Sequence, residues 1–252
     1  HGTAAKNAEL MQRQLYHEAA NTLIALAGQG LAPPYTDAHL PAYGEEALER
    51  EVSAFAEWFL PEIFFGSRLR EAQHSWRLLW QFLISSTSLE PEELVHRDYH
   101  VDNLCWLEGR SGLKRVGLLD FQDAVRGRRA YDLVSLLEDA RHDVPPTLQA
   151  EIKQSYVRAL GLHEDAFRAE YAFFGAQRNA KILGYFVRHY HQHGKARYLA
   201  MLERVWNYFL ADIQHPSLED VQRWVYKYFD SDARRRVSDI VRAPSSRLDC
   251  VE

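Results

Sequence analysis

The sequence of 252 residues is poor in cysteine and in long apolar runs. Its two cysteines, Cys105 and Cys250, stand far apart and without metal-site spacing, so we expect no disulfide framework and a reducing compartment, the cytoplasm. The longest apolar stretches, such as Leu78–Ile84, are too short to cross a bilayer. Residues 1–14 also lack the layout of a signal peptide. These absences predict a protein without a membrane partner.

The chain also lacks an excess of charge of either sign. Its formal net charge is −5, with 30 Lys and Arg against 35 Asp and Glu, and the two signs are interspersed. A dedicated nucleic-acid binder usually carries a basic stripe or a surplus of Lys and Arg. We therefore expect no nucleic-acid partner. The hydrophobic content of 46% is ample for a globular core.

What the sequence does have is helical periodicity over most of its length. The predicted helices cover residues 4–27, 45–59, 70–84, 131–141, 164–192, 198–213 and 218–237, with another beginning after Thr147. Two short apolar runs, Asn103–Leu107 and Lys114–Phe121, flank a turn with two glycines and predict a hairpin. The fold class is thus mainly α with a small embedded β-hairpin. We expect one helical lobe over residues 1–240 and an irregular tail over 241–252.

One stretch combines the residue types that phosphoryl transfer requires. Residues 96–103 read HRDYHVDN, and residues 118–123 read LLDFQD. The reaction needs a positioned hydroxyl, a carboxylate that accepts its proton, and metal ions that neutralise the phosphates. Asp98 and Asn103 can present a base and a metal ligand side by side, and Asp120 adds a hard oxygen ligand suited to Mg²⁺. Each residue alone is more typical of a turn or a helix cap; their combination indicates an active site.

This stretch resembles the catalytic loop and metal-binding segment of the protein-kinase-like superfamily. The resemblance implies that Asp98 is the catalytic base, that Asn103 and Asp120 bind Mg²⁺, and that ATP is the co-substrate. The metal-binding segment, residues 120–123, has Gln122 where protein kinases have Gly. Together with His100, this departure points to the aminoglycoside and choline phosphotransferase branch.

Four motifs are similar to those of the bacterial anomeric sugar kinases, over most of residues 94–225. They are HRDYHVDNL (96–104), GLLDFQDA (117–124), YDLVSLLEDARHDV (131–144) and RNAKILG (178–184). Those enzymes phosphorylate the 1-hydroxyl of N-acetylmuramate and N-acetylglucosamine during peptidoglycan recycling. The resemblance therefore implies an amino sugar and ATP as substrates. The alternatives are an aminoglycoside- or choline-type kinase and a non-catalytic kinase-like binding module.

The resemblance also implies three supporting residues. His96 and Arg97 support the loop, and Asp132 anchors it from the start of the following helix. A carboxylate in a first helical turn faces unsatisfied backbone N–H groups and is favoured by the helix dipole, so the residue type agrees with that role.

Four further residues are candidates for binding the acceptor: His100, Asp123, Arg178 and Lys181. The two cations are three positions apart on one helix face, where they suit the lactyl carboxylate of muramic acid. The competing interpretations are a loop brace for His100, a surface turn for Asp123 and exposed charge for the cations. The charged residues at 138–143 favour a solvated helix end over the acceptor pocket.

A kinase of this type also needs a β-rich lobe with a glycine-rich turn and a lysine that contacts the ATP phosphates. Residues 1–95 have the pattern of helix and loop instead. We therefore expect the chain to hold the carboxy-terminal lobe without the amino-terminal lobe, and to have little or no kinase activity alone.

Overall fold

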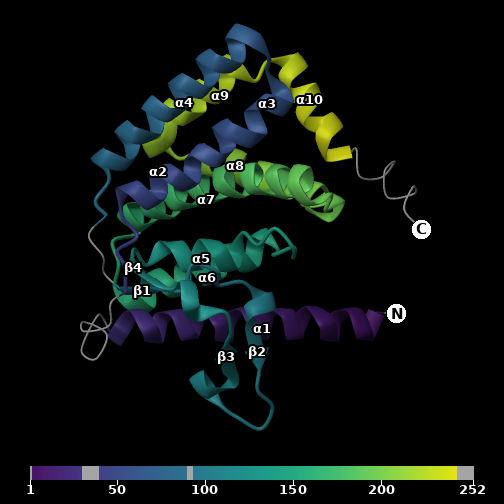
Figure 1. Cartoon of the computed structure of the whole chain (residues 1–252). Coiled ribbons are helices and arrows are strands. Elements are labelled where there is room, and N and C mark those ends of the chain that lie inside the picture. The colour runs from purple at the N-terminus through teal and green to yellow at the C-terminus, as the bar shows by residue number, and fades with distance from the viewer. Residues whose placement is uncertain (1, 30–39, 90–92, 243–252) are drawn as a thin grey trace. The chain divides into compact units, whose positions relative to one another are not determined.

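Figure 1 presents the computed structural model of the chain, which describes residues 2–29, 40–89 and 93–242. These residues are mostly helical and include two small antiparallel strand pairs. Internal contacts divide the chain into two compact units, the first with residues 1–43 and 89–171 and the second with residues 44–88 and 172–252. Within the described ranges, no helix is both long and apolar enough to span a membrane.

In the first unit, α1 (Gly2–Gln29) packs against α6 (Pro146–Leu160) and α5 (Ala130–Leu137). Tyr16, Ala19, Ala20 and Leu23 are buried on α1 because they recur every three or four positions and so share one face. Every residue of α5 is buried.

The predicted hairpin is present in a shorter form. β2 (Leu104–Trp106) pairs antiparallel with β3 (Val116–Leu118), with Leu104 opposite Leu118. A second antiparallel pair, β1 (Glu93–Val95) with β4 (Val125–Gly127), was not predicted and corrects the single embedded hairpin. Strands of three residues are too short for an alternating pattern to be recognised in the sequence.

Short 3₁₀ helices stand at the ends of the hairpin strands. η2 (Val101–Asn103) runs directly into β2, and η4 (Phe121–Asp123) follows β3 after two residues. A third, η3 (Gly112–Arg115), precedes β3. The Leu119 N–H donates to the carbonyl oxygen of Asn103 at 2.9 Å, which extends the pairing of β2 and β3 by one step. The hairpin thereby joins the two sequence segments that carry the predicted chemistry.

The second unit is helical throughout its described part. Its elements are α2 (Glu45–Ala54), the π-helical turn η1 (Phe55–Phe59), α3 (Leu60–Ile63), α4 (Gly66–Ser86), the larger part of α7 (Glu164–His193), η5 (Ala196–Met201), α8 (Leu202–Asp212), η6 (Pro216–Leu218), α9 (Glu219–Tyr228) and α10 (Ser231–Arg242). The helix predicted over 218–237 is thus divided into three elements. Arg242 still belongs to α10, beyond the predicted lobe end at residue 240, and residues 243–252 of the expected tail lie outside the described residues.

Aromatic side chains form the core of the second unit. Phe55 stacks on Phe59 and contacts Trp76, and Trp76 contacts Trp224, with ring centroids 4.5–5.0 Å apart. Gly184 of α7 meets the α2 end so closely that a Cβ there would lie 2.2 Å from the carbonyl carbon and oxygen of Ala54. Only glycine permits that approach of two backbones.

Candidate active site

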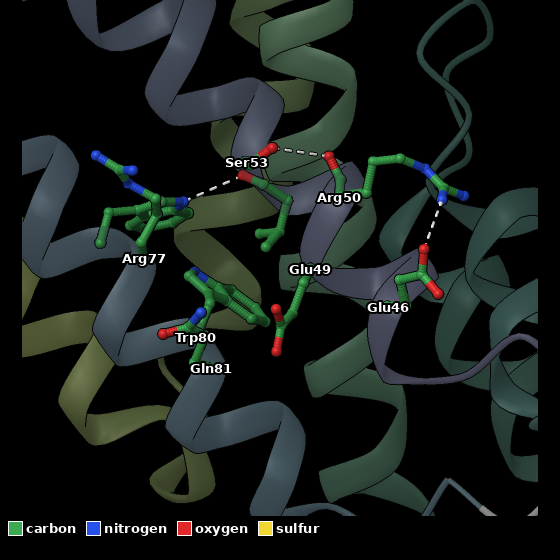
Figure 2. A pocket seen from close by; sticks show the side chains of 9 residues that line it. Glu46, Glu49, Arg50, Ser53, Arg77, Trp80 and Gln81 are labelled. Atoms are coloured by element: carbon green, nitrogen blue, oxygen red, sulfur yellow. Dashed lines mark hydrogen bonds and ion pairs between the residues drawn. The ribbon is translucent and has the colours of Figure 1, made fainter.

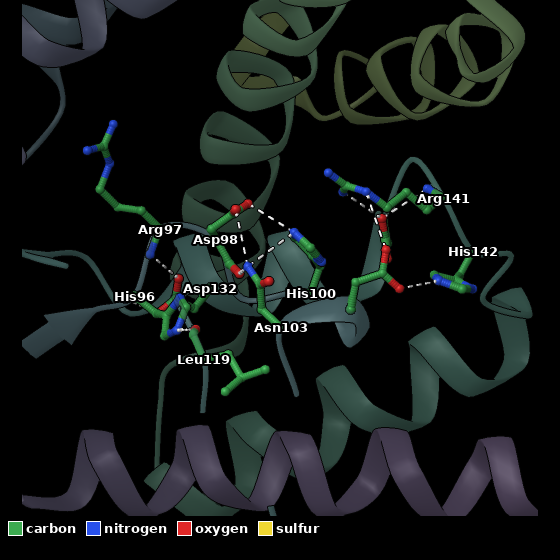
Figure 3. Close-up of polar contacts among 11 residues, drawn as sticks. His96, Arg97, Asp98, His100, Asn103, Leu119, Asp132, Arg141 and His142 are labelled. Atoms are coloured by element: carbon green, nitrogen blue, oxygen red, sulfur yellow. Dashed lines mark hydrogen bonds and ion pairs between the residues drawn. The ribbon is translucent and has the colours of Figure 1, made fainter. Parts of the chain in front are cut away.

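Three predicted residues, Asp98, His100 and Asn103, meet on the loop between β1 and β2 (Figure 3). The Asn103 amide Nδ2 donates to the Asp98 main-chain oxygen at 3.0 Å and to its carboxylate Oδ2 at 3.2 Å. His100 Nε2 lies 3.2 Å from the other carboxylate oxygen, Oδ1. The Asp98 side chain is nevertheless 53% exposed. Its carboxylate is therefore oriented by two neighbours and still open to a substrate hydroxyl.

The His100 ring braces Asp98 from a buried position. Its side chain is 4% exposed, and its Nδ1 is buried without a hydrogen-bond partner. Nε2 faces the Asp98 carboxylate and also the Asn103 Nδ2 donor at 3.4 Å. If the proton were on Nδ1, its N–H would be buried without an acceptor and the lone pair of Nε2 would face the Asp98 carboxylate. We therefore assign the proton to Nε2, which donates to Asp98. This geometry favours the loop-bracing interpretation of His100 over direct contact with the acceptor.

Leu119 ties the Asp120 segment to the catalytic loop through its main chain. Its N–H donates to the Asn103 carbonyl, and its own carbonyl accepts from His96 Nε2 at 2.8 Å. Burial lowers the pKa of His96 below its usual value, so the ring is neutral at pH 7 and its proton lies on Nε2, towards Leu119. Both main-chain groups of the residue before Asp120 are thus bonded to the loop.

Two non-glycine residues in the described chain have positive φ: Arg97, which precedes the predicted base Asp98, and Asp120, a predicted metal ligand. Arg97 has φ 71°, and Asp120 has φ 57° and ψ 39°. Such conformations cost on the order of 1–3 kcal/mol each and concentrate at functional sites, where the surrounding contacts maintain them. The bonds to Leu119 supply that support for Asp120.

The predicted metal ligands offer the hard oxygens that Mg²⁺ prefers. Asn103 uses Nδ2 for its hydrogen bonds to Asp98, which leaves its Oδ1 for a cation. Asp120 is exposed, and no described residue donates a hydrogen bond to its carboxylate. The described ranges contain no cluster of three or more His, Cys, Asp or Glu suited to a metal. A kinase-type site does not require one, because substrate phosphates and waters complete the Mg²⁺ coordination. The residues therefore fit a magnesium ion.

Asp132 holds the beginning of the loop from the first turn of α5. Its Oδ2 accepts from the His96 N–H at 2.6 Å and its Oδ1 from the Arg97 N–H at 3.0 Å. The Arg97 guanidinium lies over the Tyr43 ring, 5.3 Å from its centroid, and points away from Asp98 in Figure 3. His96, Arg97 and Asp132 thus lie where supporting residues are expected.

The end of the loop has contacts that the sequence did not predict. His142 Nε2 lies 3.0 Å from Asp102 Oδ1, and Arg141 Nε lies 3.6 Å from Asp102 Oδ2. The hydrogen bond from His142 is the main cause that lowers the pKa of Asp102. Asp102 is about forty positions from its partners in the sequence, so residue spacing could not predict the contact. The sequence shows only that an acidic residue directly precedes Asn103.

The other acceptor candidates do not join this cluster within the first unit. Asp123 ends η4 on the exposed surface. Arg178 and Lys181 belong to the second unit, where Arg178 is 5% exposed. Lys181 Nζ forms a largely buried ion pair with Glu51 Oε2 at 3.0 Å, a structural partner that the sequence did not reveal. Contacts of these residues with an acceptor remain predictions.

A separate cavity of about 300 Å³ lies between α2 and α4 of the second unit (Figure 2). It is lined by Glu46, Glu49, Arg50, Val52, Ser53, Trp76, Arg77, Trp80 and Gln81. Both indoles are almost fully buried, and Trp76 Nε1 donates to the Val52 carbonyl at 3.1 Å. None of the predicted site residues lines this cavity, so it does not belong to the candidate active site.

A loop with a braced carboxylate beside oxygen ligands for Mg²⁺ is the arrangement of enzymes that phosphorylate alcohols. The chain belongs to the phosphotransferase enzyme family, whose family model matches residues 2–174. This match confirms the resemblance to the aminoglycoside phosphotransferase branch.

Relatives in the same family carry a more specific name. The chain is 36% identical over 200 residues to an N-acetylmuramate/N-acetylglucosamine kinase of Caulobacter vibrioides, an alignment that covers 78% of the chain and 54% of the relative. It is 37% identical to a protein of that name from Neisseria meningitidis, over 67% of the chain and 51% of the relative. A third, from Pseudomonas aeruginosa, is 32% identical over 82% of the chain and 61% of the relative. The chain thus spans about half the length of the curated relatives it matches.

Proposed function

We propose that the protein is an ATP-dependent kinase that transfers the γ-phosphoryl group to the anomeric 1-hydroxyl of N-acetylmuramate or N-acetylglucosamine. The observation that carries this proposal is the arrangement of Asp98, Asn103 and the Leu119–Asp120 segment around one loop. The relatives named as kinases of these two sugars support the choice of acceptor. The same resemblance supports a place in cytoplasmic recycling of peptidoglycan sugars.

In this proposal Asp98 is the general base. Its carboxylate accepts the proton of the sugar hydroxyl while a new oxygen–phosphorus bond forms and ADP departs. His100 and Asn103 hold the carboxylate in one orientation, so no reorganisation of Asp98 is needed when the substrate arrives. Asn103 Oδ1 and the Asp120 carboxylate would hold Mg²⁺, which neutralises phosphate charge.

We further propose that residues 1–240 form the carboxy-terminal lobe of a kinase-like fold. The mainly helical chain and the hairpin that joins Asn103 to Leu119 support this assignment. The chain covers only about half of the relatives' length, and we assign none of its residues to the grip on the β- and γ-phosphates beyond Asn103 and Asp120.

Incubation of the full-length protein with Mg²⁺–ATP and a panel of acceptors tests the proposal, because this chain alone is expected to have little or no kinase activity. The panel contains N-acetylmuramate, N-acetylglucosamine, an aminoglycoside and choline, and phosphorylated products are identified by mass spectrometry. A sugar 1-phosphate that is absent without Mg²⁺ is the expected product. Phosphorylation of the aminoglycoside or of choline alone would overturn the acceptor, and Mg²⁺–ATP binding without any product would favour a binding module.

A further inference from the structure

The catalytic loop is held at its first end by α5. Asp132, in the first turn of that helix, accepts the main-chain N–H groups of His96 and Arg97. Its other end, which carries Asn103, approaches the segment that follows the same helix. A single buried helix thus lies between two contacts with one loop.

The contact at the second end is made by Asp102 with two cationic or proton-donating groups. Each carboxylate oxygen has its own partner: His142 Nε2 at 3.0 Å from Oδ1, and Arg141 Nε at 3.6 Å from Oδ2. All three side chains are partly exposed, with values of 53%, 45% and 36% for Asp102, His142 and Arg141. Exposed ion pairs contribute little to global stability, so these contacts are better suited to fix a local geometry than to hold the fold together.

The segment with Arg141 and His142 is itself fixed in place. Asp139, which is fully buried, accepts the Arg141 main-chain N–H at 2.9 Å and lies 3.5 Å from its Nη1. The carbonyl of Asp143 accepts a hydrogen bond from Gln12 Nε2 of α1 at 2.9 Å. Because Arg141 is already ordered by Asp139, its pairing with Asp102 costs less side-chain entropy than an isolated surface pair would.

We propose that Arg141 and His142 are positioning residues that act through Asp102 to fix the end of the catalytic loop that carries Asn103. Together with Asp132 they bracket the loop between the two ends of α5. Asn103 in turn orients Asp98 and bonds to Leu119, so a displacement at Asp102 reaches both the proposed base and the proposed metal ligand. The expected effect on kcat rests on the proposed function, whereas the expected effect on the order of the loop does not.

Hydrogen exchange tests the mechanical part without any assay of activity. The variants are Arg141→Gln, His142→Gln and the double variant, each followed by mass spectrometry of a peptide that covers residues 99–106. We expect this peptide in the double variant to exchange about fivefold faster, the factor that corresponds to losing one exposed ion-pair network. Arg223→Gln is the matched control, since Arg223 is 65% exposed and pairs with Glu219 and Asp220 on α9. It should leave the peptide unchanged.

Steady-state kinetics of the full-length protein test the catalytic part. In the double variant we expect kcat to fall about tenfold to hundredfold, the cost of misplacing catalytic groups by a fraction of an ångström to 1 Å. KM for ATP should stay within about twofold, since binding is not removed. Arg141→Lys should keep most of the activity, because it retains a cation opposite Asp102. Asp102→Asn combined with Arg141→Gln should be no slower than the worse single variant, because both changes remove the same contact.

The outcomes separate the two claims. Unchanged exchange of residues 99–106 in the double variant overturns the positioning role, whether or not the protein is a kinase. Faster exchange in a full-length protein that phosphorylates no acceptor supports the positioning role and rejects the proposed function. Faster exchange with unchanged kcat in an active enzyme overturns the catalytic consequence.

Discussion

Leu119 contributes to the site through its backbone, although its side chain is 47% exposed. Its N–H and C=O reach opposite ends of the catalytic loop, at Asn103 and His96. An apolar residue in a motif is easily interpreted as a core residue. Here both hydrogen bonds of Leu119 are made by its main chain and do not involve its side chain. The two hydrogen bonds explain how Asp120 is held in a left-handed conformation, which is uncommon for residues other than glycine.

Replacement of Asp98 by Asn in the full-length protein isolates the role of the carboxylate. The amide keeps the size of the side chain and can still accept one hydrogen bond, and the Asn103 bond to the main-chain oxygen of residue 98 is unaffected, so the loop should stay in place. Loss of the proton acceptor should lower kcat by roughly 10²–10⁴-fold, with ATP affinity nearly unchanged. Asp220→Asn, an exposed carboxylate on α9, is the control that should retain full turnover. Near-normal turnover of Asp98→Asn would remove the residue from its proposed role.

His96 predicts a pH dependence of stability. Its folded pKa lies below the ordinary value of 6.5, chiefly because the ring is buried. Above pH 6.5 the ring is neutral in both the folded and the unfolded state, and its contribution to the free energy of unfolding is fully present. Below that value the unfolded chain binds the proton more readily, so stability falls as the pH drops towards the folded pKa. Urea unfolding across this range should show the loss.

The comparison for this prediction is His96→Gln, whose amide can still donate to the Leu119 carbonyl but cannot titrate. It should lose less stability than the wild type as the pH falls below 6.5. His74→Gln, at an exposed position on α4, serves as the control and should follow the wild type. Parallel curves for all three proteins would show that burial of His96 does not set this dependence.

Among the secondary-structure elements, the sequence predicted the long amphipathic helices and the hairpin. The helices α1 and α7 agree with the predicted ranges to within three residues at each end, because a buried stripe repeats over several turns. The hairpin followed from two apolar runs around a glycine-rich turn. The pair β1–β4 and the π-helical turn η1 were missed. Three-residue strands have no visible alternation, and a π turn depends on packing rather than on its own residues.

The crossing of α7 with the end of α2 depends on one glycine. A methyl group at position 184 would overlap the Ala54 carbonyl, and neither backbone can move freely. Gly184→Ala should therefore lower the free energy of unfolding by about 1–3 kcal/mol or more. Gly28→Ala on α1 is the matched control, because no atom lies within 4 Å of its added methyl. The control should be neutral or stabilising by at most about 1 kcal/mol; equal losses in chemical denaturation would contradict the predicted steric clash.

At the scale of the whole molecule, the candidate site is assembled within the first unit. Asp98, Asn103, Asp120 and Asp132 all belong to it, so the site does not depend on the second unit for these residues. The sequence predicted these four from three motifs, at 96–104, 117–124 and 131–144, and Asp132 followed only from the family resemblance. It could not reveal that Asp102 meets Arg141 and His142, or that Lys181 pairs with Glu51. Such contacts follow from the packing of distant segments.

We propose that Asn103 and Asp120 hold a divalent cation beside Asp98. Paramagnetic relaxation by Mn²⁺, a stand-in for Mg²⁺, tests it most directly. In ¹⁵N-labelled protein with ATP, substoichiometric Mn²⁺ should broaden the amide signals of Asn103, Leu119 and Asp120 first, and Asp120→Ala should abolish that selective broadening. Broadening that is centred elsewhere in the chain, or that persists unchanged in Asp120→Ala, would contradict the proposed site.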